Sequence, residues 1–144
     1  MNISDAVNYQ QVIPEIFGAL AEVHAVMDAT GLLDRKLHHL VQLRASQINQ
    51  CAYCVQMHTG EARTDGESNA RLDQLVVWER SDAYSPAEQA ALAWAEALTT
   101  LQKDTDYTAL RIWLREHFSD AQIGVLTSTV AMINLWNRIQ ISTH

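Results

Sequence analysis

Residues 34–58 read DRKLHHLVQLRASQINQCAYCVQMH, and their apolar positions predict two consecutive helices. The first extends from Asp34 to Ile48, because side chains three and four residues apart fall on one face of a helix. That face carries Leu37, Leu40, Val41, Arg44 and Ile48. Asp34 is a suitable N-cap, since its carboxylate can accept a free backbone N–H group of the first turn. Asn49-Gln50 predicts a break, after which a new helix begins at about Cys51.

Helical periodicity continues on both sides of this stretch. The clearest start is Ser85-Pro86-Ala87-Glu88, which combines an N-cap serine, a proline at the first helical position and a capping-box glutamate. We expect further helices over 14–31 and 106–118, and from Ser68 and Ser119 onward. No segment alternates with period two between hairpin turns, so we expect no strands. The sequence therefore predicts an all-α fold, with residues 1–144 forming one domain of about six to seven helices.

Composition narrows the class of protein. The chain has 144 residues and a formal net charge of −7, which argues against nucleic acid or an anionic membrane as partner. No apolar run reaches the roughly 18 residues of a membrane span, and the first residues do not resemble a secretory signal. We therefore expect a cytoplasmic protein. In that compartment a cysteine pair is more often catalytic, redox-sensing or metal-binding than a structural staple.

The cysteine pair lies beside a histidine on one predicted helix. Cys51, Cys54 and His58 fall within roughly 60° of one another on its surface, at about 100° per residue. Helical neighbours three residues apart also meet the Cα separation that a disulfide requires. Closing so short a loop constrains the unfolded chain very little, so a reversible dithiol is the better interpretation.

A reversible dithiol needs a thiolate, and two features of the sequence favour one. The helix N-terminus stabilises negative charge on Cys51, and His58 can take the proton of Cys54 and hold it beside the thiolate. Helix-dipole effects fade within a turn, whereas a direct hydrogen bond does not. We therefore expect Cys54 to be the nucleophile, Cys51 the resolving thiol and His58 the base, with a peroxide as substrate.

Two other interpretations of the same residues are a zinc site and a redox sensor. Cys51, Cys54 and His58 would supply three zinc ligands, and His38 or His39 a fourth. Structural zinc sites usually draw a second pair of ligands from a distant segment, and the sequence has no second CxxC. The alternative to an enzyme is thus a non-catalytic helical oligomer with a zinc-binding or redox-sensing Cys/His site.

Several segments resemble a known family. They are LRASQIN (43–49), CAYC (51–54), MHT (57–59), ALAWAEALT (91–99) and NLWNR (134–138). These are similar to the alkyl hydroperoxidase AhpD-like branch of the carboxymuconolactone decarboxylase superfamily. The resemblance implies an all-helical domain that forms trimers or hexamers, and a peroxidase in which His58 accepts the proton of Cys54. It also implies no bound cofactor and an external dithiol reductant, lipoyl-type or thioredoxin-like, carried by a partner protein.

The sequence departs from that family at two positions. Members usually carry a glutamate that orients the histidine, and our alignment places His39 there. His39 is therefore a fourth candidate site residue, and the proton relay would run through a second imidazole or not run at all. The usual glycine before the first cysteine is Gln50, so Asn49 or Gln50 must adopt the unusual backbone angles of the turn.

Overall fold

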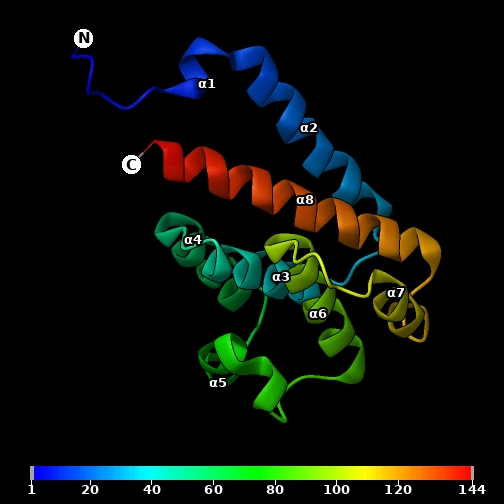
Figure 1. The fold of residues 1–144 in the computed structure, drawn as a ribbon. Coiled ribbons are helices and arrows are strands. Elements are labelled where there is room, and N and C mark those ends of the chain that lie inside the picture. The colour runs from blue at the N-terminus through cyan, green and yellow to red at the C-terminus, as the bar shows by residue number, and fades with distance from the viewer. Residues whose placement is uncertain (1, 144) are drawn as a thin grey trace.

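The computed structural model describes residues 2–143, and it confirms the all-α prediction: no strand occurs among these residues. All seven expected helices are present. The elements in chain order are α1 (Tyr9–Val12), α2 (Pro14–Thr30), α3 (Arg35–Ile48), α4 (Ala52–Thr64), α5 (Asn69–Gln74), the 3₁₀ helix η1 (Leu75–Arg80), α6 (Pro86–Thr100), α7 (Tyr107–Arg115) and α8 (Asp120–Ser142). Figure 1 shows their arrangement.

Two short elements were not expected. The four-residue α1 precedes α2, with the Asn8 side chain as its cap. The helix that begins at Ser68 does not continue through Val76 as one α-helix. It becomes 3₁₀ from Leu75, and Val77 leaves helical geometry at φ −124° and ψ 30°. Adjacent β-branched valines lose side-chain freedom in an α-helix, which accounts for a change of geometry at this point.

Helix α3 lies at the centre of the fold and packs against α4, α6 and α8. The apolar side chains of α3 are divided between two clusters of the core. Leu37 and Val41 pack with residues of α6, α7 and α8, whereas Leu40 and Leu43 pack with residues of α4, α5, η1 and α6. Arg44, on the predicted apolar face, donates from Nε to Glu96 of α6 at 2.7 Å. The helix that carries His39 is therefore held on several sides.

The predicted helix starts are formed as expected. Both capping boxes are complete, at Ser85 with Glu88 and at Ser119 with Gln122. Asp34 caps α3 by accepting from the backbone N–H of Leu37 at 3.1 Å. Each cap of this kind contributes about 1 kcal/mol to stability. Local sequence therefore specifies where these helices begin.

The turn between α3 and α4 places the first cysteine. Gln50 adopts a left-handed conformation with φ 58°, which confirms that one of the two expected residues takes the unusual angles. The N–H of Gln50 bonds the Gln47 carbonyl, and the N–H of Cys51 bonds the Ser46 carbonyl, at 3.2 and 3.1 Å. This is the Schellman pattern of helix termination. It ends α3 and makes Cys51 the N-cap of α4.

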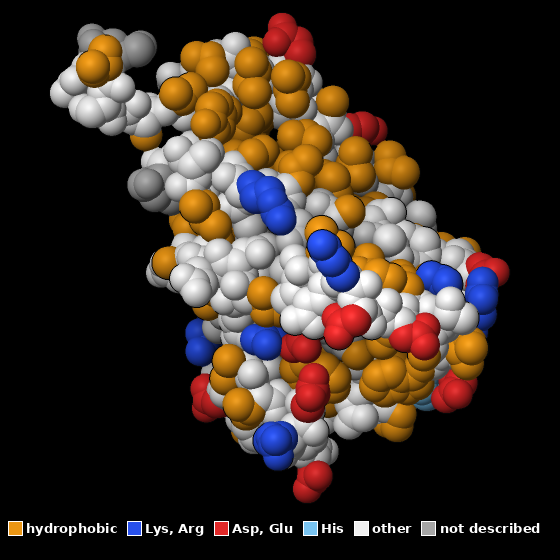
Figure 2. All heavy atoms as spheres, viewed as in Figure 1, with side chains coloured by type: hydrophobic (Ala, Val, Ile, Leu, Met, Phe, Trp, Pro, Cys, Tyr) orange, Lys and Arg blue, Asp and Glu red, His pale blue; other side chains and the backbone are white. Residues whose placement is uncertain are grey.

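Helix α2 lies against α8 with few buried side chains. Phe17 and His24 of α2 both contact the indole of Trp136 in α8, with ring centroids 5.6 and 5.9 Å apart. Met27 is the one buried residue of α2. Figure 2 shows apolar side chains gathered over α1 and α2, and the exposed ones include Val12, Ile16, Val23 and Val26. None of the helices in residues 2–143 has the length and apolar character to cross a membrane.

Candidate active site

Cys51 and Cys54 form a disulfide at the start of α4, with their Cα atoms 5.3 Å apart. Both are buried, at 2% and 1% exposure. The Cys51 sulfur also accepts the backbone N–H of Cys54 at 3.3 Å, so it acts as the helix N-cap. The expectation that these cysteines are close enough to bridge is confirmed.

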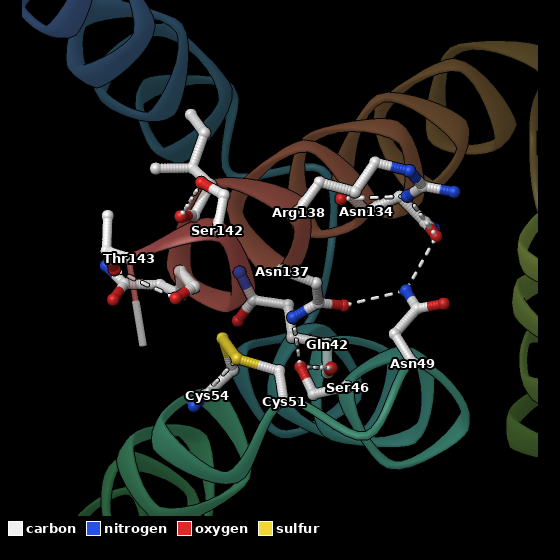
Figure 3. Close-up of a disulfide and its surroundings, with 12 residues drawn as sticks. Gln42, Ser46, Asn49, Cys51, Cys54, Asn134, Asn137, Arg138, Ser142 and Thr143 are labelled. Atoms are coloured by element: carbon white, nitrogen blue, oxygen red, sulfur yellow. Dashed lines mark hydrogen bonds between the residues drawn. A yellow bond between two sulfur atoms is a disulfide. The ribbon is translucent and has the colours of Figure 1, made fainter. Parts of the chain in front are cut away.

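A polar cluster between α3 and α8 supports the cysteine turn (Figure 3). Asn49 donates from Nδ2 to the side-chain oxygens of Asn134 and Asn137, at 2.8 and 2.9 Å. Asn137, which is fully buried, donates in turn to the hydroxyl of Ser46 at 2.9 Å. Ser46 donates to the backbone carbonyl of Gln42 at 2.8 Å. These bonds tie the last turn of α3 to α8 and thereby fix the segment that leads into Cys51.

A cavity of about 850 Å³ opens between α2, α3, α4 and α8, and Cys54 lines it. The other three helices supply the opposing walls, with Met27 from α2, Gln42 from α3 and Trp136 from α8 among them. His39 and His58 also line this cavity. The structure therefore brings three of the four predicted site residues, Cys54, His58 and His39, to one space. The fourth, Cys51, lies behind Cys54 in the disulfide.

His58 is a buried imidazole paired with a carboxylate. Its exposure is 5%, and its Nδ1 lies 3.1 Å from Oε2 of Glu61. Because a carboxylate only accepts, Nδ1 carries the proton and Nε2 keeps its lone pair in the neutral ring. Burial lowers the pKa of His58 from 6.5, and the hydrogen bond and charge of Glu61 oppose that shift. His58 is thus neutral at physiological pH and can accept a proton at Nε2.

His39 is buried on the facing helix and contacts two carboxylates. Its Nε2 donates to Oδ2 of Asp65 at 2.5 Å, while its Nδ1 lies 3.7 Å from Oε2 of Glu61 without a hydrogen bond. Asp65 also accepts from Arg35 Nε at 3.1 Å. The His39 and Arg35 hydrogen bonds hold the pKa of Asp65 below its ordinary 3.8. Imidazoles and carboxylates therefore alternate along a row that runs His58, Glu61, His39, Asp65 and ends at the guanidinium of Arg35.

The carboxylate of Glu61 was missed in the sequence. The sequence left open whether a second imidazole, His39, takes part in the relay; in the structure the hydrogen bond to His58 comes from Glu61. The signal was available, because Cys54, His58, Glu61 and Asp65 follow one another at intervals of four, three and four residues. Side chains at these intervals share one face of a helix. The acid that contacts His58 therefore comes from α4 itself.

His38, which the zinc interpretation offered as a possible fourth ligand, lies beside His39 on α3. Burial, together with the neighbouring His39, lowers the pKa of His38 to about 4. His38 is therefore neutral at physiological pH, and its Nδ1 lies 3.4 Å from the Thr129 hydroxyl. Within residues 2–143, no group of three or more His, Cys, Asp or Glu side chains is arranged to hold a metal ion.

Comparison with known proteins places these features in a family. The model of the carboxymuconolactone decarboxylase family matches residues 14–97. The uncharacterised protein YdfG of Bacillus subtilis (strain 168) is 34% identical over 140 residues, which are 97% of this chain and 95% of YdfG.

Solved structures agree with that match. A protein of unknown function from Agrobacterium tumefaciens, proposed to be the antioxidant defence protein AhpD, is 37% identical, with a TM-score of 0.87 over 96% of this chain and 94% of its own. A variant of the debrominase Bmp8 bound to 2,3,4-tribromopyrrole shares the fold, with a TM-score of 0.83 and 20% identity over 93% of this chain and 71% of its own. The family match and the identity to these relatives show that the chain belongs to the carboxymuconolactone decarboxylase family, in its AhpD-like branch.

Proposed function

We propose that this protein is a thiol-dependent peroxidase that reduces a hydroperoxide to an alcohol and water. The observation that carries the proposal is the placement of Cys54 on the wall of a cavity of about 850 Å³, with Cys51 bonded behind it and the buried, neutral His58 one turn along α4. The likeness to the Agrobacterium tumefaciens protein proposed to be AhpD supports it.

The first step begins with the reduced dithiol. Side chains on a helix lean toward its N-terminus, so the His58 ring extends toward Cys54 one turn earlier. Because Nδ1 is engaged by Glu61, Nε2 is the atom that accepts the Cys54 proton. The product is a thiolate beside an imidazolium, which activates a cysteine for nucleophilic attack.

The thiolate then attacks the terminal oxygen of the hydroperoxide. A sulfur–oxygen bond forms while the oxygen–oxygen bond breaks, and the leaving alkoxide takes the proton from His58 and departs as an alcohol. The sulfur of Cys54 is oxidised to a sulfenic acid as the peroxide is reduced. The Glu61 carboxylate stabilises the imidazolium that exists between these two proton transfers.

The second step closes the disulfide. The thiol of Cys51 attacks the sulfenic sulfur, a sulfur–sulfur bond forms, and the sulfur–oxygen bond breaks. Hydroxide leaves and takes up the thiol proton as water. The short Cα separation of 5.3 Å supports this step, because neither cysteine needs to move far.

An external dithiol protein, lipoyl-type or thioredoxin-like, completes the cycle by reducing the disulfide. We propose that no bound cofactor takes part and that the protein acts in the cytoplasm, where such dithiols are available. We further propose a homo-trimer or homo-hexamer, which the exposed apolar side chains over α1 and α2 support.

Peroxide consumption tests the proposal directly. Reduced protein is mixed with hydrogen peroxide or cumene hydroperoxide, with dihydrolipoamide, thioredoxin or glutathione as reductant. We expect turnover with a dithiol, and no turnover for Cys54→Ser. Cys51→Ser should stop after one oxidation and yield a sulfenic acid at Cys54 that a dimedone-type reagent traps.

The two variants are matched controls for each other, since the chain contains only two cysteines. Absence of peroxide consumption by the wild-type protein with every reductant, together with no disulfide formation after peroxide treatment, would contradict the proposed function. A dimedone adduct on Cys51 in Cys54→Ser would reverse the two roles.

A further inference from the structure

Gln42 is a buried amide on the cavity wall that the chemistry above does not use. It lies on α3, one helical turn after His39 and on the same face. The residue is 5% exposed, it lines the cavity, and its Oε1 is buried without a hydrogen-bond partner. Figure 3 draws Gln42 among the residues that surround the Cys51–Cys54 disulfide.

An unpaired amide oxygen at this position costs stability. Burying a polar group without a partner is unfavourable, and an apolar side chain of the same shape would avoid that cost. Methionine has nearly the length of glutamine and would fill the same space. Buried polar groups left without a partner are uncommon in folded proteins, and a catalytic role is one explanation for them.

The proposed reaction creates a need for a hydrogen-bond acceptor near Cys54. The terminal oxygen of a hydroperoxide carries a hydrogen, and it still carries that hydrogen after its transfer to sulfur as a sulfenic acid. His58 cannot accept from this hydroxyl during attack, because Nδ1 bonds Glu61 and Nε2 holds the Cys54 proton for the leaving alkoxide. Another group in the cavity therefore has to accept the hydrogen bond from this hydroxyl.

Two buried atoms on the cavity wall are available acceptors. Among the described residues, the buried side-chain atoms without a hydrogen bond are Oε1 of Gln42, Nδ1 of His39 and Oε2 of Glu67, and the first two residues line the cavity. His39 Nδ1 faces the carboxylate of Glu61 at 3.7 Å. Gln42 lines the same cavity as Cys54 and is among the residues drawn around the disulfide in Figure 3. The position of Gln42 is therefore the one that suits a group being transferred to Cys54.

We propose that Gln42 positions the substrate, its amide oxygen accepting a hydrogen bond from the hydroxyl that moves from the peroxide to Cys54. This inference rests on the proposed function and deepens it. The bond forms before attack, when it aligns the terminal oxygen with the sulfur, and it persists in the sulfenic acid. Gln42 forms and breaks no covalent bond and holds no proton of its own for transfer.

The backbone that carries Gln42 is held in place by hydrogen bonds. The backbone carbonyl of Gln42 accepts from Ser46, which is bonded to Asn137 of α8. This chain links the backbone at Gln42 to the turn that carries Cys51. The residue that holds the oxygen and the residue that resolves the sulfenic acid are thus tied to the same framework.

Gln42→Met is the decisive variant, because it keeps the length of the side chain and removes both hydrogen-bonding groups. Oxidation of reduced protein by cumene hydroperoxide is followed by stopped flow, and alkylation by iodoacetamide is followed in parallel. Alkylation transfers no hydroxyl and so reports on the thiolate alone. We expect Gln42→Met to slow oxidation by about tenfold, the equivalent of one lost hydrogen bond, while alkylation keeps its wild-type rate. The melting temperature should stay equal or rise.

Gln56→Met is the matched control, since Gln56 is exposed on α4 and lies outside the cavity lining. It should leave both rates unchanged. Wild-type rates of both reactions in Gln42→Met would overturn the assignment while the peroxidase function stands. An equal loss of oxidation and alkylation would also overturn it, by showing an effect on the thiolate or on packing. A wild-type protein that no hydroperoxide oxidises would overturn the function and this inference together.

Discussion

The pairing of Glu61 with His58 leads to a quantitative expectation for the reactivity of Cys54. Glu61→Gln keeps the size of the side chain and removes its charge. In the native protein Glu61 opposes the effect of burial on the pKa of His58, so its neutralisation should lower that pKa further. A less stable imidazolium means that fewer molecules hold the proton on His58 and the negative charge on Cys54.

The size of the effect follows from the geometry. A charge-assisted hydrogen bond such as the 3.1 Å contact between His58 and Glu61 contributes about 1.5–3 kcal/mol where both groups are buried. The Glu61 side chain is 46% exposed, so solvent reduces the contribution to about 1 kcal/mol. That energy corresponds to a factor of about five in an equilibrium constant. The reactive thiolate–imidazolium pair should therefore become about fivefold less populated near neutral pH.

Alkylation of Cys54 measures this population. The rate of iodoacetamide reaction is recorded against pH in a Cys51→Ser background, where Cys54 is the one remaining thiol. Glu61→Gln should lower the rate at pH 7 about fivefold and shift the midpoint of the profile upward. Glu79→Gln removes the same charge from an exposed position outside the cavity and should leave the profile unchanged. Superimposable profiles for Glu61→Gln and the parent protein would refute the role of Glu61.

Two further predictions concern stability. His38 has a pKa of about 4 in the folded protein against 6.5 in the unfolded chain, so the unfolded state binds more protons between these values and stability is lost as pH falls. Urea unfolding at pH 7 and at pH 4.5 should show a loss from this group of about 2 kcal/mol that His38→Gln removes; an equal loss in the variant would assign the loss to another group. Gln50 holds a left-handed φ of 58°, so Gln50→Gly should stabilise the protein by up to about 1 kcal/mol. Thermal unfolding checks this, and a lower melting temperature would show that the Gln50 side chain contributes more than its backbone strain costs.

The sequence by itself determined the helices and the reactive face. The capping boxes at Ser85 and Ser119 satisfy backbone N–H groups within a few residues, so the start of each helix can be predicted from the local sequence. The spacing of Cys54 and His58 places them on one side of α4 whatever that helix packs against, with Cys51 as the N-cap just before it. The family resemblance, through its usual glycine at this turn, led us to expect left-handed backbone angles at Asn49 or Gln50, and Gln50 adopts them.

Only the tertiary structure decided what faces Cys54. Helical periodicity shows which residues share a face of one helix, but it does not show which other helix covers that face. The contact of His39 with Asp65 joins α3 to α4 across 26 positions of sequence, and the cavity exists because α2 and α8 close over both. Glu61 could be placed beside His58 by spacing alone, yet its position between two imidazoles depends on how α3 and α4 pack. The unpaired oxygen of Gln42 also depends on that packing, because a side chain acquires or lacks a partner only when the helices around it come together.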